Sequence, residues 1–129
     1  MQVITPGGCG NSPRSQLTVE LFEQWVLGNV APWLPWLAKD FEWWRAGEGI
    51  AQGPESVTRM FPGFEAEHAE ISSVITHGRF ASCDGFLLGA GVRLDFSHVL
   101  RFTGAGKTAN IAQVRSYLIE SSAERPAPR

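Results

Sequence analysis

The longest regular pattern of apolar and polar residues lies between Val92 and Phe102. Apolar side chains alternate there with mostly polar ones, and His98 alone interrupts the apolar row. This period of two predicts a β-strand with one buried face and one largely solvated face. A second apolar stretch, Ala109–Ile119, follows the glycine-containing segment Gly104–Lys107. Because glycine tolerates the backbone angles of tight turns, we expect the two stretches to form a hairpin.

The first half of the chain carries helical signals. Ser12 followed by Pro13 is typical of a helix start, and Gly28 is typical of a helix end. Apolar residues between them recur at helical spacing and form one broad stripe. Three further elements are predicted before residue 62: a short helix containing Pro32 and Pro35, a short strand at Phe41–Ala46, and a third helix at Pro54–Phe61.

Two more strands are predicted before the hairpin, one within Phe64–His77 and one at Arg79–Leu88. Asp84-Gly85 interrupts the second and predicts a tight turn or a bulge. This order favours an α+β fold in which a curved antiparallel sheet wraps over three N-terminal helices. The predicted organisation is a flexible leader at 1–11, one domain at 12–120 and a flexible tail at 121–129.

Composition narrows the range of partners. A net charge of −2 gives no electrostatic footprint for nucleic acid, and no apolar run approaches the ~20 residues that span a bilayer. The N-terminus lacks the apolar segment of a secretory signal, so we expect a cytoplasmic protein without membrane contact. The two cysteines, Cys9 and Cys83, do not suggest a disulfide framework.

His98 is the strongest candidate for chemistry. An inward imidazole can act as a general acid or base, or can orient a polar group of a ligand. The alternative is a core histidine that is hydrogen-bonded to its neighbours. Glu42 shares a predicted strand face with Trp44, so a Glu42–His98 pair could supply an acid and a base to one cavity. Glu42 could equally be solvated at a strand end.

Other patterns are weaker. All five tryptophans lie between Trp25 and Trp44, where they either pack the core or line a ligand cavity. The segment GAGKT lacks the first glycine of a phosphate loop and lies in a predicted hairpin. His68, Glu70 and His77 have no spacing typical of a metal site, and we expect no metal and no cofactor.

Two segments carry a resemblance to a known family. The segment Ser97–Glu120, which contains HVLRFTGAGKTANIAQVRSYLIE, and the segment FEWWRAGEGIAQGPESVTRMF are similar to patterns of the nuclear transport factor 2-like superfamily. That superfamily includes steroid isomerases and SnoaL-like cyclases. The resemblance covers roughly 13–120 and implies a cystatin-like cone with a deep apolar internal pocket, commonly assembled as a homodimer through the sheet.

The resemblance also implies where a site would lie. The steroid isomerase pattern places its general base at Trp44, its oxyanion-hole tyrosine near Leu21 and its protonated aspartate at His98. Trp44 cannot accept a proton and Leu21 cannot donate one, whereas His98 can donate, which argues against steroid isomerisation by that mechanism. The remaining candidates are catalytic His98 and Glu42, and a pocket lining of Leu21, Trp25, Trp44, Phe61, Phe96, Val114, Ser116 and Leu118.

Three functions remain open. The chain could be a cofactor-free enzyme for cyclisation, isomerisation, dehydration or hydrolysis, with His98 as acid or base. It could bind a small hydrophobic metabolite without catalysis. It could also be a dimerising interaction module whose cavity is filled by its own tryptophans. By resemblance, a second subunit should cover the outer face formed by Arg93, Asp95, Ser97, Val99 and Arg101.

Overall fold

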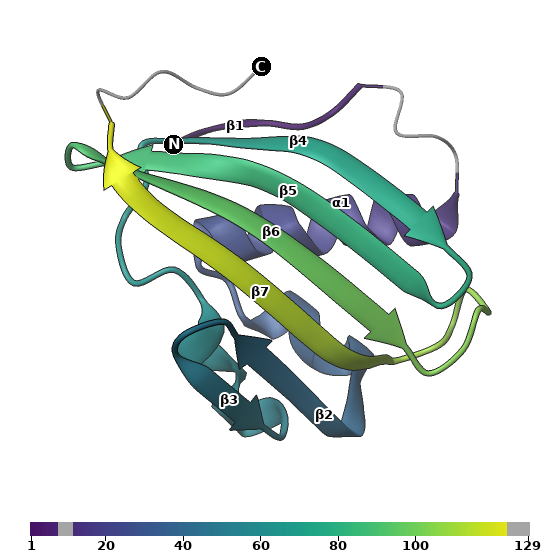
Figure 1. Cartoon of the computed structure of the whole chain (residues 1–129). Coiled ribbons are helices and arrows are strands. Elements are labelled where there is room, and N and C mark those ends of the chain that lie inside the picture. Colours follow the sequence, from purple (N-terminus) through teal and green to yellow (C-terminus); the bar gives the residue numbers. More distant parts are fainter. Residues whose placement is uncertain (8–11, 124–129) are drawn as a thin grey trace.

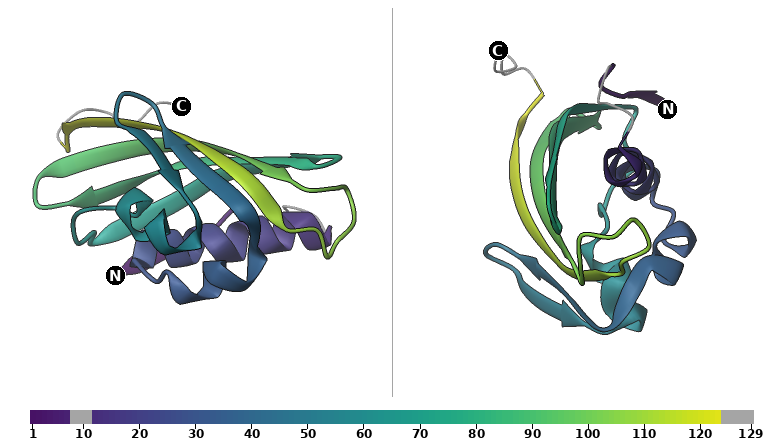
Figure 2. Two further views of the ribbon diagram at one scale, coloured as in Figure 1. Left: turned by 90° about the horizontal axis from the view of Figure 1, so that it is seen from below. Right: turned by 90° about the vertical axis from the view of Figure 1, so that its right-hand side faces the viewer.

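The computed structural model describes residues 1–7 and 12–123. A single seven-stranded sheet curves around one long helix and two short helices (Figures 1 and 2). The elements in chain order are β1 (Gln2–Ile4), α1 (Pro13–Leu27), η1 (Ala31–Trp36), β2 (Leu37–Arg45), β3 (Gly49–Gln52), η2 (Pro54–Met60), β4 (His68–His77), β5 (Phe80–Gly89), β6 (Val92–Phe102) and β7 (Ile111–Ser122).

The strand order is β1-β4-β5-β6-β7-β2-β3. Strands β4 to β7 form an antiparallel meander, whereas β1 joins β4 and β2 joins β7 in parallel. The predicted α+β class with a curved, mostly antiparallel sheet is therefore confirmed. Two of the three predicted helices, η1 and η2, are 3₁₀ helices. Each carries proline near its start, and η1 has Pro35 inside it, which does not suit longer α-helical hydrogen bonding.

The ends of α1 follow the sequence signals. The Ser12 side chain accepts a hydrogen bond from the Ser15 amide at 3.2 Å, and Gly28 adopts the left-handed conformation with φ of 80°. Both caps therefore satisfy backbone groups that the helix itself leaves free.

Three boundaries differ from the sequence prediction. Strand β7 extends to Ser122, two residues into the predicted tail. Gln2–Ile4 form β1 at the sheet edge instead of belonging to a flexible leader. Strand β2 begins at Leu37, four residues before the predicted start. Residues 8–11 and the tail residues 124–129 lie outside the described residues.

Asp84-Gly85 lies inside the continuous strand β5, opposite a register shift in β4 between Ile71 and Ser73. A side chain at Gly85 would collide with the Glu70 carbonyl oxygen and the Phe96 ring. Glycine is therefore required there because another strand's backbone approaches it closely. The bulge alternative of the sequence prediction describes this irregularity better than a turn.

Arg14 fixes the start of α1 against the sheet. Its guanidinium donates to the carbonyl oxygens of Gly78 and Gly106 at 3.3 and 2.8 Å, and it lies 3.7 Å from the centre of the Phe102 ring. Burial lowers the pKa of Arg14 from its ordinary value. These contacts join the start of α1 to two hairpin turns. They fix the position of the helix on the concave face of the sheet (Figure 2).

No helix within 1–7 and 12–123 is long and apolar enough to cross a membrane.

Candidate functional site

His98 lies in the middle of β6, on the face that looks toward α1. Its neighbours across the sheet are Cys83 on β5 and Ser116 on β7. Its exposed fraction is 0%. The inward position that the alternating pattern predicted is therefore confirmed.

One hydrogen-bonded chain joins His98 to β2. His98 Nδ1 lies 2.7 Å from Ser116 Oγ, and Trp43 Nε1 donates to the same oxygen at 2.7 Å. Because an indole nitrogen can only donate, Ser116 Oγ accepts from Trp43. Among the hydrogen bonds of the described residues, His98 Nδ1 is the one acceptor within reach of the Ser116 hydroxyl proton, so we take Ser116 as the donor to His98. We therefore assign the imidazole proton to Nε2.

His98 Nε2 is buried without a hydrogen-bond partner among the described residues. Aromatic rings surround the imidazole instead: Phe22 stacks on it with centroids 4.4 Å apart, Phe96 stacks at 5.2 Å, and Trp25 meets it nearly edge-on at 4.5 Å. A buried donor without a partner costs free energy. Among the buried side-chain nitrogen and oxygen atoms of residues 1–7 and 12–123, this one alone lacks a partner, and it lies inside an aromatic shell.

The same burial controls the charge of His98. Desolvation lowers the pKa of His98 from 6.5 to about 3, because the imidazolium would lose its hydration inside the apolar shell. The imidazole is neutral near pH 7. His98 is fully enclosed by side chains in this structure, and its role as an acid or a base remains a prediction.

Most of the predicted pocket residues do face the interior. Six of them are buried in the core and Leu118 packs against it, the six being Leu21, Trp25, Phe61, Phe96, Val114 and Ser116. Their contact with a ligand remains a prediction.

The prediction that Glu42 and Trp44 face the interior is wrong. They lie on the opposite face of β2 from the buried residues Phe41 and Trp43. Glu42 accepts a hydrogen bond from Gln113 at 2.9 Å, and Trp44 packs against the exposed Tyr117 with ring centroids 5.5 Å apart. The expected Glu42–His98 pair is therefore not formed, and Trp44 does not line the interior.

Trp43, whose exposed fraction is 0%, was not among the predicted site residues. The resemblance to the steroid isomerase pattern had assigned the inner face of FEWW to Glu42 and Trp44 instead. The residues themselves carry a signal. Within FEWWR, the face of Phe41 and Trp43 carries its charge, Arg45, at the strand end, whereas the other face places Glu42 in the middle of the apolar residues. Burying an unpaired carboxylate is costly, so the face of Phe41 and Trp43 is the better choice for the core.

In all three fully buried tryptophans, Trp25, Trp33 and Trp43, the indole N–H group donates a hydrogen bond. Besides the Trp43 bond to Ser116, Trp25 donates to the Met60 carbonyl at 3.0 Å and Trp33 donates to the Leu21 carbonyl at 2.8 Å. Such bonds hold each ring in one orientation as well as burying it. The rings therefore belong to a specified core.

Comparisons with known proteins identify the fold and nothing finer. No protein-family model matches the sequence, and no curated protein matches it either. Solved structures do match. An NTF2-like protein of unknown function from Burkholderia xenovorans LB400 is 12% identical, with a TM-score of 0.70 and 95% of this chain and 91% of that chain covered.

Two further neighbours have functional descriptions. A putative ketosteroid isomerase from Kribbella flavida DSM 17836 is 14% identical, with a TM-score of 0.67 and coverage of 91% of this chain and 84% of that one. The epoxide hydrolase/cyclase-like enzyme SalBIII, described in pyran ring formation in the polyether salinomycin, is 13% identical, with a TM-score of 0.66 and coverage of 84% and 95%. The chain has the nuclear transport factor 2-like fold, as its sequence resemblance implied.

Proposed function

We propose that this chain is a non-catalytic nuclear transport factor 2-like interaction module that self-associates through the outer face of its sheet. The observation that carries the proposal is the complete burial of His98 within Phe22, Trp25 and Phe96. These side chains fill the region where the fold resemblance placed a pocket. With Glu42 on the other face, His98 has no carboxylate partner. We therefore assign no acid–base step to it.

The outer face of the sheet has the character of an interface. Four of its apolar residues are exposed: Ile75 on β4 at 65%, Phe80 on β5 at 39%, Tyr117 on β7 at 43% and Ile119 on β7 at 69%. Isolated exposed apolar residues are ordinary, but these four lie on one face of the sheet, on β4, β5 and β7, with β6 between the last two. Joined with a second copy, they would be removed from water.

The same face also offers a hollow. Ile75, Phe80 and Val99 border a shallow depression of about 230 Å³. An apolar side chain of a second copy could occupy it. This favours contact through β4, β5 and β6 as well as β7.

Charge on this face is already neutralised in part. Arg93 is only 5% exposed, forms an ion pair with Asp95 at 2.9 Å and lies 4.0 Å from the centre of the Phe86 ring. An interface across this face would therefore not have to bury an unpaired Arg93 charge.

Analytical ultracentrifugation tests the assembly. The parent should sediment at about twice the chain mass of 14.1 kDa at micromolar concentration. The double variant Ile75→Glu/Ile119→Glu should be monomeric, because two carboxylates would enter the apolar contact. Leu34→Glu, which also replaces an exposed apolar residue by glutamate but lies on η1, should leave the protein dimeric. A monomeric parent would contradict the proposal.

A second candidate function is favoured by one atom, His98 Nε2. We propose that a small hydrophobic molecule with one acceptor oxygen accepts a hydrogen bond from this unpaired N–H group. Phe22 or Trp25 would have to move to admit the molecule. A ketone is the simplest such molecule. No catalysis is needed for this binding.

Acetophenone can serve as the probe for this second candidate. Binding should shift the ¹⁵N resonance of His98 Nε2 and should weaken more than tenfold in His98→Phe, or about 1.4 kcal/mol. His77→Gln, a change at an exposed histidine that adds no apolar ring to the outer face, is the control. Equal affinity of parent and His98→Phe would leave His98 as a core residue only.

A further inference from the structure

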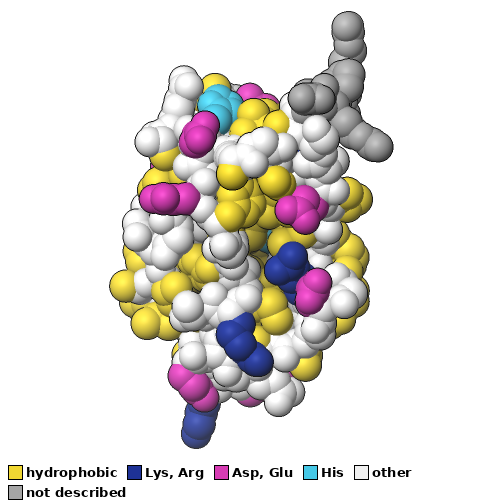
Figure 3. All heavy atoms as spheres, turned by 90° about the vertical axis from the view of Figure 1, so that its left-hand side faces the viewer, with side chains coloured by type: hydrophobic (Ala, Val, Ile, Leu, Met, Phe, Trp, Pro, Cys, Tyr) yellow, Lys and Arg dark blue, Asp and Glu magenta, His cyan; other side chains and the backbone are white. Residues whose placement is uncertain are grey.

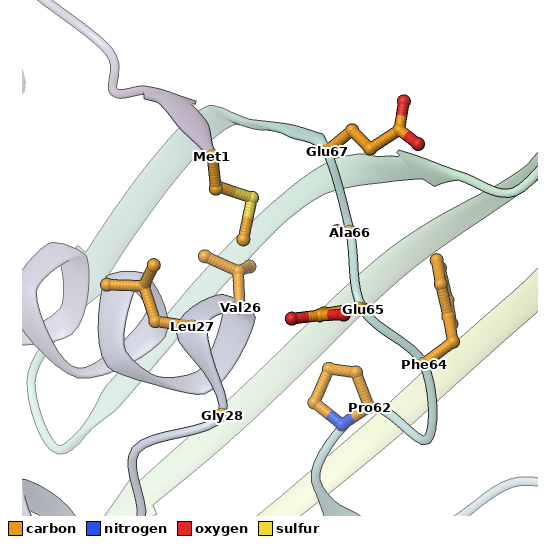
Figure 4. A pocket seen from close by; sticks show the side chains of 9 residues that line it. All are labelled: Met1, Val26, Leu27, Gly28, Pro62, Phe64, Glu65, Ala66 and Glu67. Atoms are coloured by element: carbon orange, nitrogen blue, oxygen red, sulfur yellow. The ribbon is translucent and has the colours of Figure 1, made fainter.

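A second hollow lies at the end of the molecule that carries the N-terminus, away from His98. We call it the end pocket. The residues that line it include Met1, Val26, Leu27, Pro62, Phe64 and Glu65 (Figure 4). Its volume is about 530 Å³, within the range of small-molecule sites. Apolar side chains reach the surface at this end of the molecule, with both acidic and basic side chains around them (Figure 3).

The wall formed by residues 62–67 is held in place by backbone contacts. The Glu67 amide donates to the Leu88 carbonyl at 2.7 Å, and the Gln2 amide donates to the Glu67 carbonyl at 3.2 Å. Gly89 packs so closely beneath that a Cβ atom there would lie 2.6 Å from the Glu65 carbonyl oxygen. The pocket wall is thus fixed between β5 and β1 before any ligand arrives.

The opposite wall is the end of α1. The bond from Trp25 Nε1 to the Met60 carbonyl ties this helix end to η2, which leads directly into residues 62–67. Both walls are therefore joined to the same closed core. A preformed site of this kind avoids the entropic cost of ordering loops on binding.

One charged group points into the end pocket. The Glu65 carboxylate is directed between Val26 and Pro62, whereas the Glu67 carboxylate points away (Figure 4). Within 1–7 and 12–123, neither carboxylate forms an ion pair, including with the amino group of Met1. Glu65 therefore has no cation that neutralises it directly.

The helix end adds a negative potential of the same sign. The carboxyl end of an α-helix carries about half a negative charge. The last turn of α1 contains no Lys or Arg that would offset it. Glu65 and the helix end thus favour a cation, while Val26, Leu27 and Phe64 favour an apolar body.

We infer that the end pocket binds an apolar molecule that carries one ammonium group, with the ammonium at Glu65 and the hydrocarbon against Val26, Leu27 and Phe64. This site is separate from His98 and from the outer face of the sheet. It therefore does not depend on self-association or on an opening of the core.

Three probes of equal chain length separate charge from hydrocarbon: octylammonium, octanol and octanoate, each below its micelle concentration. Titrations followed by amide and methyl NMR shifts should perturb Val26, Leu27 and Ala66. Octylammonium should bind roughly five- to tenfold more tightly than octanol, and octanoate more weakly than both, because the local potential is negative.

Two carboxamide variants provide a matched pair. Glu65→Gln should abolish the preference for octylammonium and leave the affinity for octanol unchanged. Glu67→Gln, two residues away with its side chain directed outward, should keep the preference within about twofold of the parent. Leu27→Ala should weaken all three probes, since it removes hydrocarbon contact alone.

Several outcomes would overturn the inference. Equal affinities for the three probes would show that Glu65 sets no charge preference. An unchanged preference in Glu65→Gln, or an equal loss in Glu67→Gln, would place the cation elsewhere. Shifts confined to the outer face of the sheet would place the hydrocarbon there instead. Failure of the end pocket would leave the sedimentation result untouched, so the two proposals can be judged separately.

Discussion

The two faces of the central strands differ in how completely they are satisfied. The inner face ends in a packed aromatic shell around His98, from which solvent is excluded. The outer face carries side chains as bulky as Ile75 and Ile119 but leaves them exposed at 65% and 69%. The same alternation along the chain thus produces a buried core on one side of the sheet and exposed apolar side chains on the other. The proposed self-association would use the outer side, where apolar side chains remain exposed.

Adjacent tryptophans of β2 give the most direct test of this difference. Trp43→Ala should lower the free energy of unfolding by roughly 3–5 kcal/mol, because it leaves a cavity between Trp33 and Phe61 and frees the Ser116 hydroxyl. Urea denaturation at fixed protein concentration would measure it. A loss under 1 kcal/mol would mean that the core is less tightly packed than described.

Trp44→Ala is the matched control for that measurement. Trp44 is half-buried and contacts Tyr117 on the outer face, so its truncation should cost far less than that of Trp43. Trp36, one of the five tryptophans expected to pack the core or line a cavity, is also only half-buried. If Trp44→Ala proved as costly as Trp43→Ala, the assignment of the two faces of β2 would be wrong.

Local patterns predicted the parts of the fold that depend on neighbours in sequence. The hairpin of β6 and β7, the caps of α1 and the inward position of His98 all follow from periodicity and turn residues. The face of β2 could not be read in the same way. Its orientation is fixed by parallel pairing with β7, about seventy residues later, where Trp43 reaches Ser116.

The candidate site was harder to predict than the fold. The sequence placed a polar residue on an apolar face, but it could not show whether Phe22 and Trp25 would fill the space beside it. That depends on how α1 is seated, which Arg14 fixes through carbonyl groups in two turns distant in sequence. The end pocket left no periodic signal, because it forms where β1, α1 and residues 62–67 meet.

The pH dependence of stability sharpens the comparison further. The pKa of His98 is about 3 in the folded chain and near 6.5 once the residue is exposed by unfolding. Between these values the unfolded chain binds one proton more than the folded chain, so stability is lost as pH falls below 6.5. From pH 7 to pH 4.5 the linkage amounts to about 2.5 kcal/mol from this residue.

Carboxylates elsewhere also titrate in this range, so the contribution of His98 must be measured as a difference between variants. Urea midpoints at pH 7 and pH 4.5 should give a fall in unfolding free energy that is about 2–3 kcal/mol smaller in His98→Phe than in the parent. His77→Gln, a change at an exposed histidine that adds no apolar ring to the outer face, should keep the parental fall. Such a result would show that His98 remains uncharged and enclosed in solution. If His98→Phe and the parent lost the same stability, water would reach the imidazole, the aromatic shell would be open, and binding at Nε2 would become the better account of this interior.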